Sequence, residues 1–229
     1  MTTAQLTFKI TGNNLCDFAN FETGANAELV ARLKLLAAGS GGQGIWLWGE
    51  AGSGRSHLLQ AVCAQAAEVE RPAFYLPLAQ LPSQPMITEG LAGGVIALDD
   101  IDCWLGDKDL EAALVGLYQL QLESDGVLVI ASARPAASVE FAVPDLASRF
   151  RALSSYRVQP LDDAGLTRVL QASARRRGLV LNDATADFWL TRSRRSLPLL
   201  LAELDQLDQA ALASQRRLTI PLLKAVLQL

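Results

Sequence analysis

The sequence predicts an α/β domain built on a parallel five-stranded sheet, followed by a small all-helical domain. Up to Pro160, short apolar segments alternate with segments of helical periodicity, which is typical of parallel strands joined by helices. The apolar segments are almost continuously hydrophobic, as strands buried on both faces are. After Pro160 the patterns have helical spacing, so the boundary between the two domains is expected near this residue.

Strands are expected where short apolar runs lie between turn signals, and helices where leucine and alanine recur every three to four residues. The five expected strands are residues 44–49, 73–78, 93–100, 126–133 and 154–161. The two expected helices between them are residues 54–69 and 108–124. Together these segments form the α/β domain.

Four helices are expected in the second domain, at residues 161–178, 182–193, 196–215 and 219–229. Each begins near a side chain that can cap a helix, namely Asp162, Asn182, Ser196 and Thr219. The predicted organisation is therefore a tail (1–15), an α/β domain (16–160) and a helical domain (161–229).

The composition excludes several classes of protein. Half of the 229 residues are hydrophobic, so a sizeable core is available, and a net charge of −4 argues against a general nucleic-acid binder. No signal peptide or membrane-spanning run is visible, so we expect a soluble, cytoplasmic protein without a membrane partner. The spacing of Cys16, Cys63 and Cys103 matches no zinc site, which favours buried free thiols in a reducing compartment.

The segment "GEAGSGRSH" (49–57) is almost a phosphate-binding loop, with arginine where the pattern has lysine. It follows an expected strand and opens an expected helix, where backbone N–H groups and the helix N-terminus can bind phosphate. A planar guanidinium can replace the lysine in binding, but not with the same geometry for hydrolysis. The alternative is a glycine-rich turn without a ligand. The residues expected at the nucleotide are Gly49, Gly52, Ser53, Gly54, Arg55, Ser56 and His57. For His57 the alternative, which its place on an apolar helix favours, is a histidine packed in the core.

The segment "VIALDD" (95–100) is a buried strand that ends in acids, which is the Walker B arrangement. Asp99 and the Ser56 hydroxyl are the expected Mg²⁺ groups, and Asp100 lies where an ATPase places the acid that polarises the attacking water. The alternative is that Asp100 and Asp102 only cap the turn that follows.

Arg149 in "PDLASRF" (144–150) is a candidate arginine finger, which would reach a nucleotide on a neighbouring protein. The alternative is a surface arginine in a helical turn. Basic clusters at 174–178 and 192–195 are either solvated faces or a patch for an acidic partner or DNA phosphates.

These motifs, together with "DFANFETGAN" (17–26) and the four expected C-terminal helices, resemble the AAA+ module of the bacterial replication initiator DnaA. The resemblance runs from about Asp17 to Leu229. Within that group, "GRSHLL" and "VPDLASR" are most similar to the Hda family of DnaA-related proteins, which inactivate the initiator. In the initiator the first segment lies against adenine, which implies cofactor-binding roles for Phe21 and Asn26.

The resemblance implies ADP or ATP with Mg²⁺ as cofactors and DnaA as a partner, with Arg149 reaching DnaA-bound ATP. The segment "QLTFKI" (5–10) is similar to a short peptide that binds the sliding clamp, the beta subunit of DNA polymerase III. The clamp-binding residues would be Gln5, Leu6, Phe8 and Ile10, although their alternation also suits an edge strand.

Three departures bear on hydrolysis by this chain: Arg55, Ala133 at the position of a sensor acid, and Pro198 at the position of a sensor arginine. They favour an ADP-bound, clamp-docked activator of DnaA-bound ATP hydrolysis, which negatively regulates replication initiation. The alternatives are a self-sufficient AAA+ ATPase, acting on DNA as an initiator paralogue or helicase loader, and a nucleotide-free adaptor. The sequence does not decide whether the chain makes weak contacts with DNA or forms a homo-oligomer.

Overall fold

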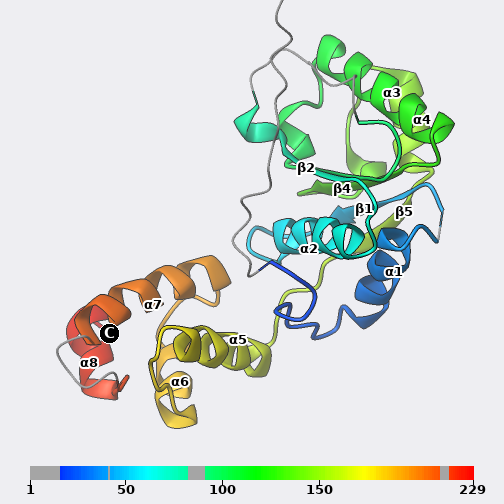
Figure 1. The fold of residues 1–229 in the computed structure, drawn as a ribbon. Coiled ribbons are helices and arrows are strands. Elements are labelled where there is room, and N and C mark those ends of the chain that lie inside the picture. Colours follow the sequence, from blue (N-terminus) through cyan, green and yellow to red (C-terminus); the bar gives the residue numbers. More distant parts are fainter. Residues whose placement is uncertain (1–15, 41, 82–90, 212–216) are drawn as a thin grey trace, which may run out of the picture. The chain divides into compact units, whose positions relative to one another are not determined.

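The computed structural model describes residues 16–40, 42–81, 91–211 and 217–229 (Figure 1). The chain divides between Gln159 and Pro160 into two compact units. The expected clamp-binding residues Gln5, Leu6, Phe8 and Ile10 lie outside the described residues.

The first unit contains a five-stranded sheet with the strand order β2-β3-β4-β1-β5, in which every neighbouring pair is parallel. The predicted fold class is therefore confirmed. The strands are β1 (Gly44–Trp48), β2 (Ala73–Pro77), β3 (Val95–Asp99), β4 (Val127–Ser132) and β5 (Ser154–Arg157). Strand β5 is shorter than the predicted segment because its partner β1 ends at Trp48, opposite Arg157, and the N–H of Gln159 donates to the Asn26 side chain instead.

Helices cover both faces of this sheet, with α1 and α2 on one side and α3 and α4 on the other (Figure 1). Their bounds are α1 (Ala27–Ala37), α2 (Arg55–Glu68), α3 (Lys108–Glu123) and α4 (Pro144–Arg151), with short 3-10 turns η1 (Leu78–Gln80), η2 (Ile101–Cys103) and η3 (Ala136–Ser138). The sequence patterns predicted α2 and α3 but neither α1 nor α4. Helix α4 has only eight residues and buries three of them, so its periodicity is too short to detect.

Alternate residues of the strands fill two separate cores. In β1, Trp46 packs into the α3–α4 core, whereas Ile45 and Leu47 pack into the α1–α2 core. The Trp46 ring lies 5.8 Å from the Phe150 ring, and its Nε1 donates a hydrogen bond of 2.9 Å to the backbone oxygen of Arg134. Helix α4 is thus anchored directly on the central part of the sheet.

The second unit is helical, as predicted, with α5 (Asp163–Arg176), α6 (Asp183–Leu190), α7 (Leu197–Ala211) and α8 (Ile220–Leu227). Asp162, Asn182 and Thr219 cap α5, α6 and α8 through their side-chain oxygens, as the sequence indicated. The core is built around the fully buried Trp189, whose Nε1 donates to Glu203 Oε2 at 2.6 Å. None of the helices in the described segments is long and apolar enough to cross a membrane.

The three cysteines are free thiols, but they are not all buried. Burial in α2 raises the pKa of Cys63 to about 12, so this thiol stays protonated. Cys103 is exposed in η2, and its Sγ donates to the backbone oxygen of Asp100 at 2.9 Å. The expectation of buried thiols is therefore wrong for Cys103.

A buried carboxylate joins α3 to the segment that leads into α4. Glu111 is fully buried and accepts three backbone hydrogen bonds, from the N–H groups of Gly106 (2.7 Å), Ala142 (3.0 Å) and Val143 (2.7 Å). Val143 is the N-cap residue of α4, so this carboxylate fixes where α4 begins.

We expect Glu111→Ala to lower the free energy of unfolding by about 3 kcal/mol or more, because it leaves several buried N–H groups without an acceptor. The matched control is Glu123→Ala on the same helix, since Glu123 is exposed and accepts a hydrogen bond from the Gln119 side chain at the surface. The control substitution should lower the free energy of unfolding by about 0.5 kcal/mol or less. Urea unfolding of both variants would measure the difference, and similar losses would contradict this role of Glu111.

Candidate nucleotide site

The loop between β1 and α2 requires glycine at three positions. Gly52 and Gly54 have φ angles of 80° and 100°, in the left-handed region that other residues rarely adopt. At Gly49 a Cβ atom would lie 2.9 Å from the backbone oxygen of Val158. The glycines therefore determine the conformation of the loop, and α2 begins directly after it at Arg55.

The segment of residues 17–26 crosses the start of α2. A Cβ atom on Gly54 would lie 2.8 Å from Cε2 of Phe21, so the Phe21 ring lies directly against the loop. The Phe21 and His57 rings are 5.4 Å apart, and His57 Nε2 is 2.8 Å from the backbone oxygen of Asp17. The structure thus brings Phe21, Gly54 and His57 together, and His57 holds the segment in place.

Asn26 ties the same segment to the end of β5. Its side chain is 3% exposed, its Nδ2 donates to the backbone oxygen of Gln159 at 3.0 Å, and its Oδ1 accepts from the Gln159 N–H at 2.7 Å. The side-chain amide of Asn26 thus both donates to and accepts from the backbone of Gln159. The contacts of Asn26 therefore shape the path of the segment that carries Phe21.

The loop has the features that a bound phosphate needs. The α2 N-terminus begins directly after it, Arg55 is half-buried, and the Ser56 hydroxyl lies exposed in the first helical turn. The Ser53 hydroxyl is buried with no hydrogen-bond partner among the described residues, which is costly for a folded chain. A phosphate group fits this donor set of backbone amides, hydroxyls and a guanidinium.

Asp99 ends β3 and is 3% exposed. Two donors stabilise its carboxylate: the Tyr75 hydroxyl at 2.7 Å from Oδ2 and the backbone N–H of Asp100 at 3.0 Å from Oδ1. Sequence reasoning missed Tyr75, whose position on the neighbouring strand is not evident from any local motif. The Tyr75 hydroxyl fixes the orientation of the Asp99 carboxylate, which is the expected Mg²⁺ ligand group.

Asp100 and Asp102 differ in what they bind. Asp102 accepts from the Ser132 hydroxyl at 2.9 Å and the Ala133 N–H at 2.7 Å, so it joins η2 to the end of β4. The side chain of Asp100 makes no capping bond to η2, although Asp100 is the N-cap residue. The capping alternative therefore fails for Asp100, while Asp102 has a structural role.

The pKa of Asp100 is raised above its ordinary value by partial burial of the carboxyl and by the negative charges of Asp99 and Asp102. The positive charge of Arg55 acts in the opposite direction on the same pKa. Within the described segments, no group of three or more His, Cys, Asp or Glu side chains could hold a metal ion. A Mg²⁺ ion near Ser56 and Asp99 would therefore need phosphate oxygens and waters as further ligands.

Both parts of the chain are similar to known proteins. Residues 163–227 match the family model described as the Hda lid domain. The chain is 17% identical to domain III of the replication initiation protein DnaA from Thermotoga maritima, with a TM-score of 0.81 over 94% of this chain and 97% of that one. The chain therefore has the AAA+ fold, and its second unit is similar to the Hda lid domain. The matched residues span α5 to α8.

Two further solved structures share the fold at low sequence identity. AMPPCP-bound DnaA from Aquifex aeolicus is 18% identical, with a TM-score of 0.68 over 84% of this chain and 65% of that one. The RuvB Holliday junction branch migration motor of Thermotoga maritima is 17% identical, with a TM-score of 0.69 over 88% and 67%. At these identities the likeness concerns the AAA+ fold.

Arg149 does not join the loop residues. It lies on α4, where its Nε donates to Asp145 Oδ2 at 3.0 Å and its Nη1 donates to Gln119 Oε1 at 3.3 Å. The side chain is 27% exposed. Arg149 therefore belongs to the α3–α4 layer, apart from the acids and the glycine loop.

The basic clusters of the lid are partly used within the lid itself. Arg177 forms an ion pair with Asp205 at 2.5 Å, and Arg195 forms one with Asp163 at 2.7 Å. These contacts join α5 to α7 and to the α6–α7 connection. Part of each cluster therefore has a structural role. The run of arginines in the sequence is not enough to predict an unpaired basic surface.

We expect Asp100→Asn to stabilise the protein at neutral pH, because it removes a carboxylate whose raised pKa makes its charged form unfavourable in the folded state. The gain should shrink as the pH falls toward about 4, where the wild-type carboxyl also becomes neutral. Thermal melting across this pH range would measure it.

The control is Asp125→Asn, because Asp100 and Asp125 share a φ angle of 53° and Asn tolerates this conformation well. A backbone preference would raise the melting temperature of both variants equally at every pH. An increase for Asp100→Asn that does not depend on pH would contradict the electrostatic origin.

Proposed function

We propose that this chain regulates chromosome replication initiation as an ADP-bound protein that stimulates hydrolysis of the ATP bound to DnaA. The observation that carries the proposal is a glycine loop with a complete acid pair in the same chain as an Hda lid. The first feature favours a nucleotide, and the second favours the branch of DnaA-related proteins that inactivate the initiator.

The first unit offers a consistent site for an adenine nucleotide. The α2 N-terminus and Arg55 would bind the phosphates, and Phe21 would line the nucleotide beside the loop. Ser56 and Asp99 would hold Mg²⁺, which when bound neutralises charge on the phosphate oxygens. DnaA from Aquifex aeolicus, which shares this fold, was solved with the nucleotide analogue AMPPCP.

We expect little hydrolysis by this chain alone. Arg55 replaces the compact charge of a lysine, and Ala133 offers no side-chain acid at the end of β4, where its N–H is bound to Asp102. Pro198 in α7 likewise cannot act as a sensor arginine. The chain would then act mainly through another protein's ATP.

Arg149 is the residue that we propose for this action in trans. Its guanidinium is partly exposed on α4, and within the described segments two of its five N–H donors bond to neighbouring side chains. A guanidinium presented to the γ-phosphate of a neighbour stabilises the charge that develops during phosphoryl transfer. Docking on the sliding clamp would rest on residues 5–10, which lie outside the described residues.

A self-sufficient ATPase is the second candidate, because Asp99 and Asp100 form a complete acid pair of the kind that ATPases use. The purified chain distinguishes the two functions. A self-sufficient ATPase would turn over ATP without DnaA and bind DNA without the clamp, whereas the proposed regulator would do neither efficiently.

We expect Arg55→Ala to weaken ADP binding by about 1–3 kcal/mol, the range for a hydrogen bond to a charged group. Arg55→Lys restores the usual loop residue and should bind ADP at least as well as the wild type. Calorimetric titration with Mg²⁺–ADP would measure both. Unchanged affinity in the alanine variant would show that Arg55 does not contact the phosphates.

We expect Arg149→Ala to reduce stimulation of DnaA-bound ATP hydrolysis by about 10³-fold or more if chemistry limits the rate. The control is Arg151→Ala, which removes a second exposed arginine from the same helix, one that lies over the Phe141 ring instead. The control should stimulate normally. Normal stimulation by Arg149→Ala, with both variants folded, would rule out the proposed function of this residue.

A further inference from the structure

The side chain of Arg149 is held from three directions. Asp145, one turn earlier on α4, accepts from its Nε at 3.0 Å, and Gln119 on α3 accepts from its Nη1 at 3.3 Å. The guanidinium carbon lies 5.2 Å from the centre of the Tyr118 ring, which is within the range of a cation–π contact. A surface arginine without such contacts would sample many rotamers, so this one is unusually constrained.

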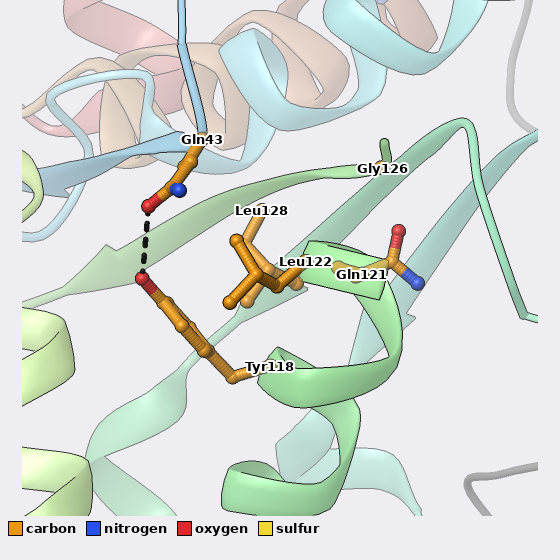
Figure 2. Close-up of a pocket in the computed structure, with 6 residues that line it drawn as sticks. All are labelled: Gln43, Tyr118, Gln121, Leu122, Gly126 and Leu128. Carbon is orange, nitrogen blue, oxygen red and sulfur yellow. Dashed lines mark hydrogen bonds between the residues drawn. The ribbon is translucent and has the colours of Figure 1, made fainter. Parts of the chain in front are cut away.

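Tyr118 is itself fixed at its far end. Its hydroxyl donates to Gln43 Oε1 at 3.2 Å, and Figure 2 shows these two side chains pointing toward each other from α3 and from the start of β1. The residue is 8% exposed, and its ring packs 6.3 Å from the Phe150 ring. Tyr118 therefore gives Arg149 a rigid support that is anchored to the sheet.

The contacts of Arg149 leave the outer part of its guanidinium available. Arginine has five N–H donors in a planar fork, of which Nε and one N–H of Nη1 bond to residues that the structure describes. The three remaining N–H groups lie on Nη1 and Nη2, the end of the fork that forms paired bonds to phosphate. Asp145 binds the side of the fork and does not block its end.

We propose that Asp145 and Tyr118 are positioning residues that orient Arg149 toward a phosphate on a partner. This inference rests on the proposed function of Arg149 in trans. The Asp145 carboxylate fixes the rotation of the guanidinium plane through its bond to Nε. The Tyr118 ring supports the guanidinium from below and keeps it at a constant distance from α3. An arginine that is already oriented before docking loses less freedom when it meets the transition state, so the two residues act on the rate of the chemical step.

The test is single-turnover hydrolysis of ATP preloaded on DnaA, measured while the full chain is titrated in the presence of DNA-loaded clamp. We expect Asp145→Ala and Tyr118→Leu to lower the maximal rate constant by roughly 10–100-fold, the scale of a small misplacement of a catalytic group. The half-saturating concentration should stay the same, because docking is intact. Tyr118→Phe keeps the ring and should retain most of the rate.

The Arg149→Ala background separates positioning from other roles. There, Asp145→Ala and Tyr118→Leu should have no further effect on the maximal rate, since they act only through Arg149. Asp109→Ala, which removes an exposed acid from α3, is the control for lost charge. Melting temperatures would show that each variant is folded.

The outcomes distinguish this inference from the proposed function. If Arg149→Ala stimulates normally, the proposed function itself fails. If Arg149→Ala is inactive but Asp145→Ala and Tyr118→Leu retain the full maximal rate, the proposed function stands and the positioning role is overturned. A higher maximal rate for Asp145→Ala, or an equal loss in the Arg149→Ala background, would also overturn it.

Discussion

The parallel pairing of β1 with its two neighbours is the constraint on which the candidate site depends. Trp48, the last residue of β1, is in register with Ser132 at the end of β4 and with Arg157 at the end of β5. Because parallel strands point the same way, the segments that follow them meet at one edge of the sheet. A slip of one residue would also exchange the faces of Trp46 and its neighbours, moving a tryptophan out of the α3–α4 core.

Long-range polar bridges then fix the segments that leave this edge. Asn26 joins the segment before α1 to Gln159, Tyr75 joins β2 to Asp99, and Asp102 joins η2 to the end of β4. Each bridge satisfies polar groups that burial would otherwise leave unpaired. In the α3–α4 layer, Glu111 performs the same task for the start of α4. The sheet thus sets where the segments lie, and these side chains set how precisely they are held.

This division explains what could be predicted from the sequence. The strands, the lid helices and the glycine loop have local signatures, such as the apolar run of β3 or the capping residue Asn182, and these were predicted. The bridges have none, because Asn26 and Gln159 are 133 residues apart and Arg149 and Gln119 are 30 apart. Helix α4 was missed for a related reason, since its eight residues depend on Glu111 and on packing against Trp46. Contacts between distant segments cannot be deduced from spacing in one sequence.

Backbone and side chains contribute differently to the proposed chemistry. A glycine loop and a helix N-terminus bind phosphate through backbone N–H groups, and these depend on Gly52 and Gly54 keeping their φ angles. Turnover instead needs particular side chains at particular points, and on the proposed function three of those points would carry Arg55, Ala133 and Pro198. Substitutions at those points leave the backbone donors intact. On the proposed function, a chain of this kind can therefore retain a nucleotide and contribute the well-positioned cation of Arg149 to a reaction in another protein.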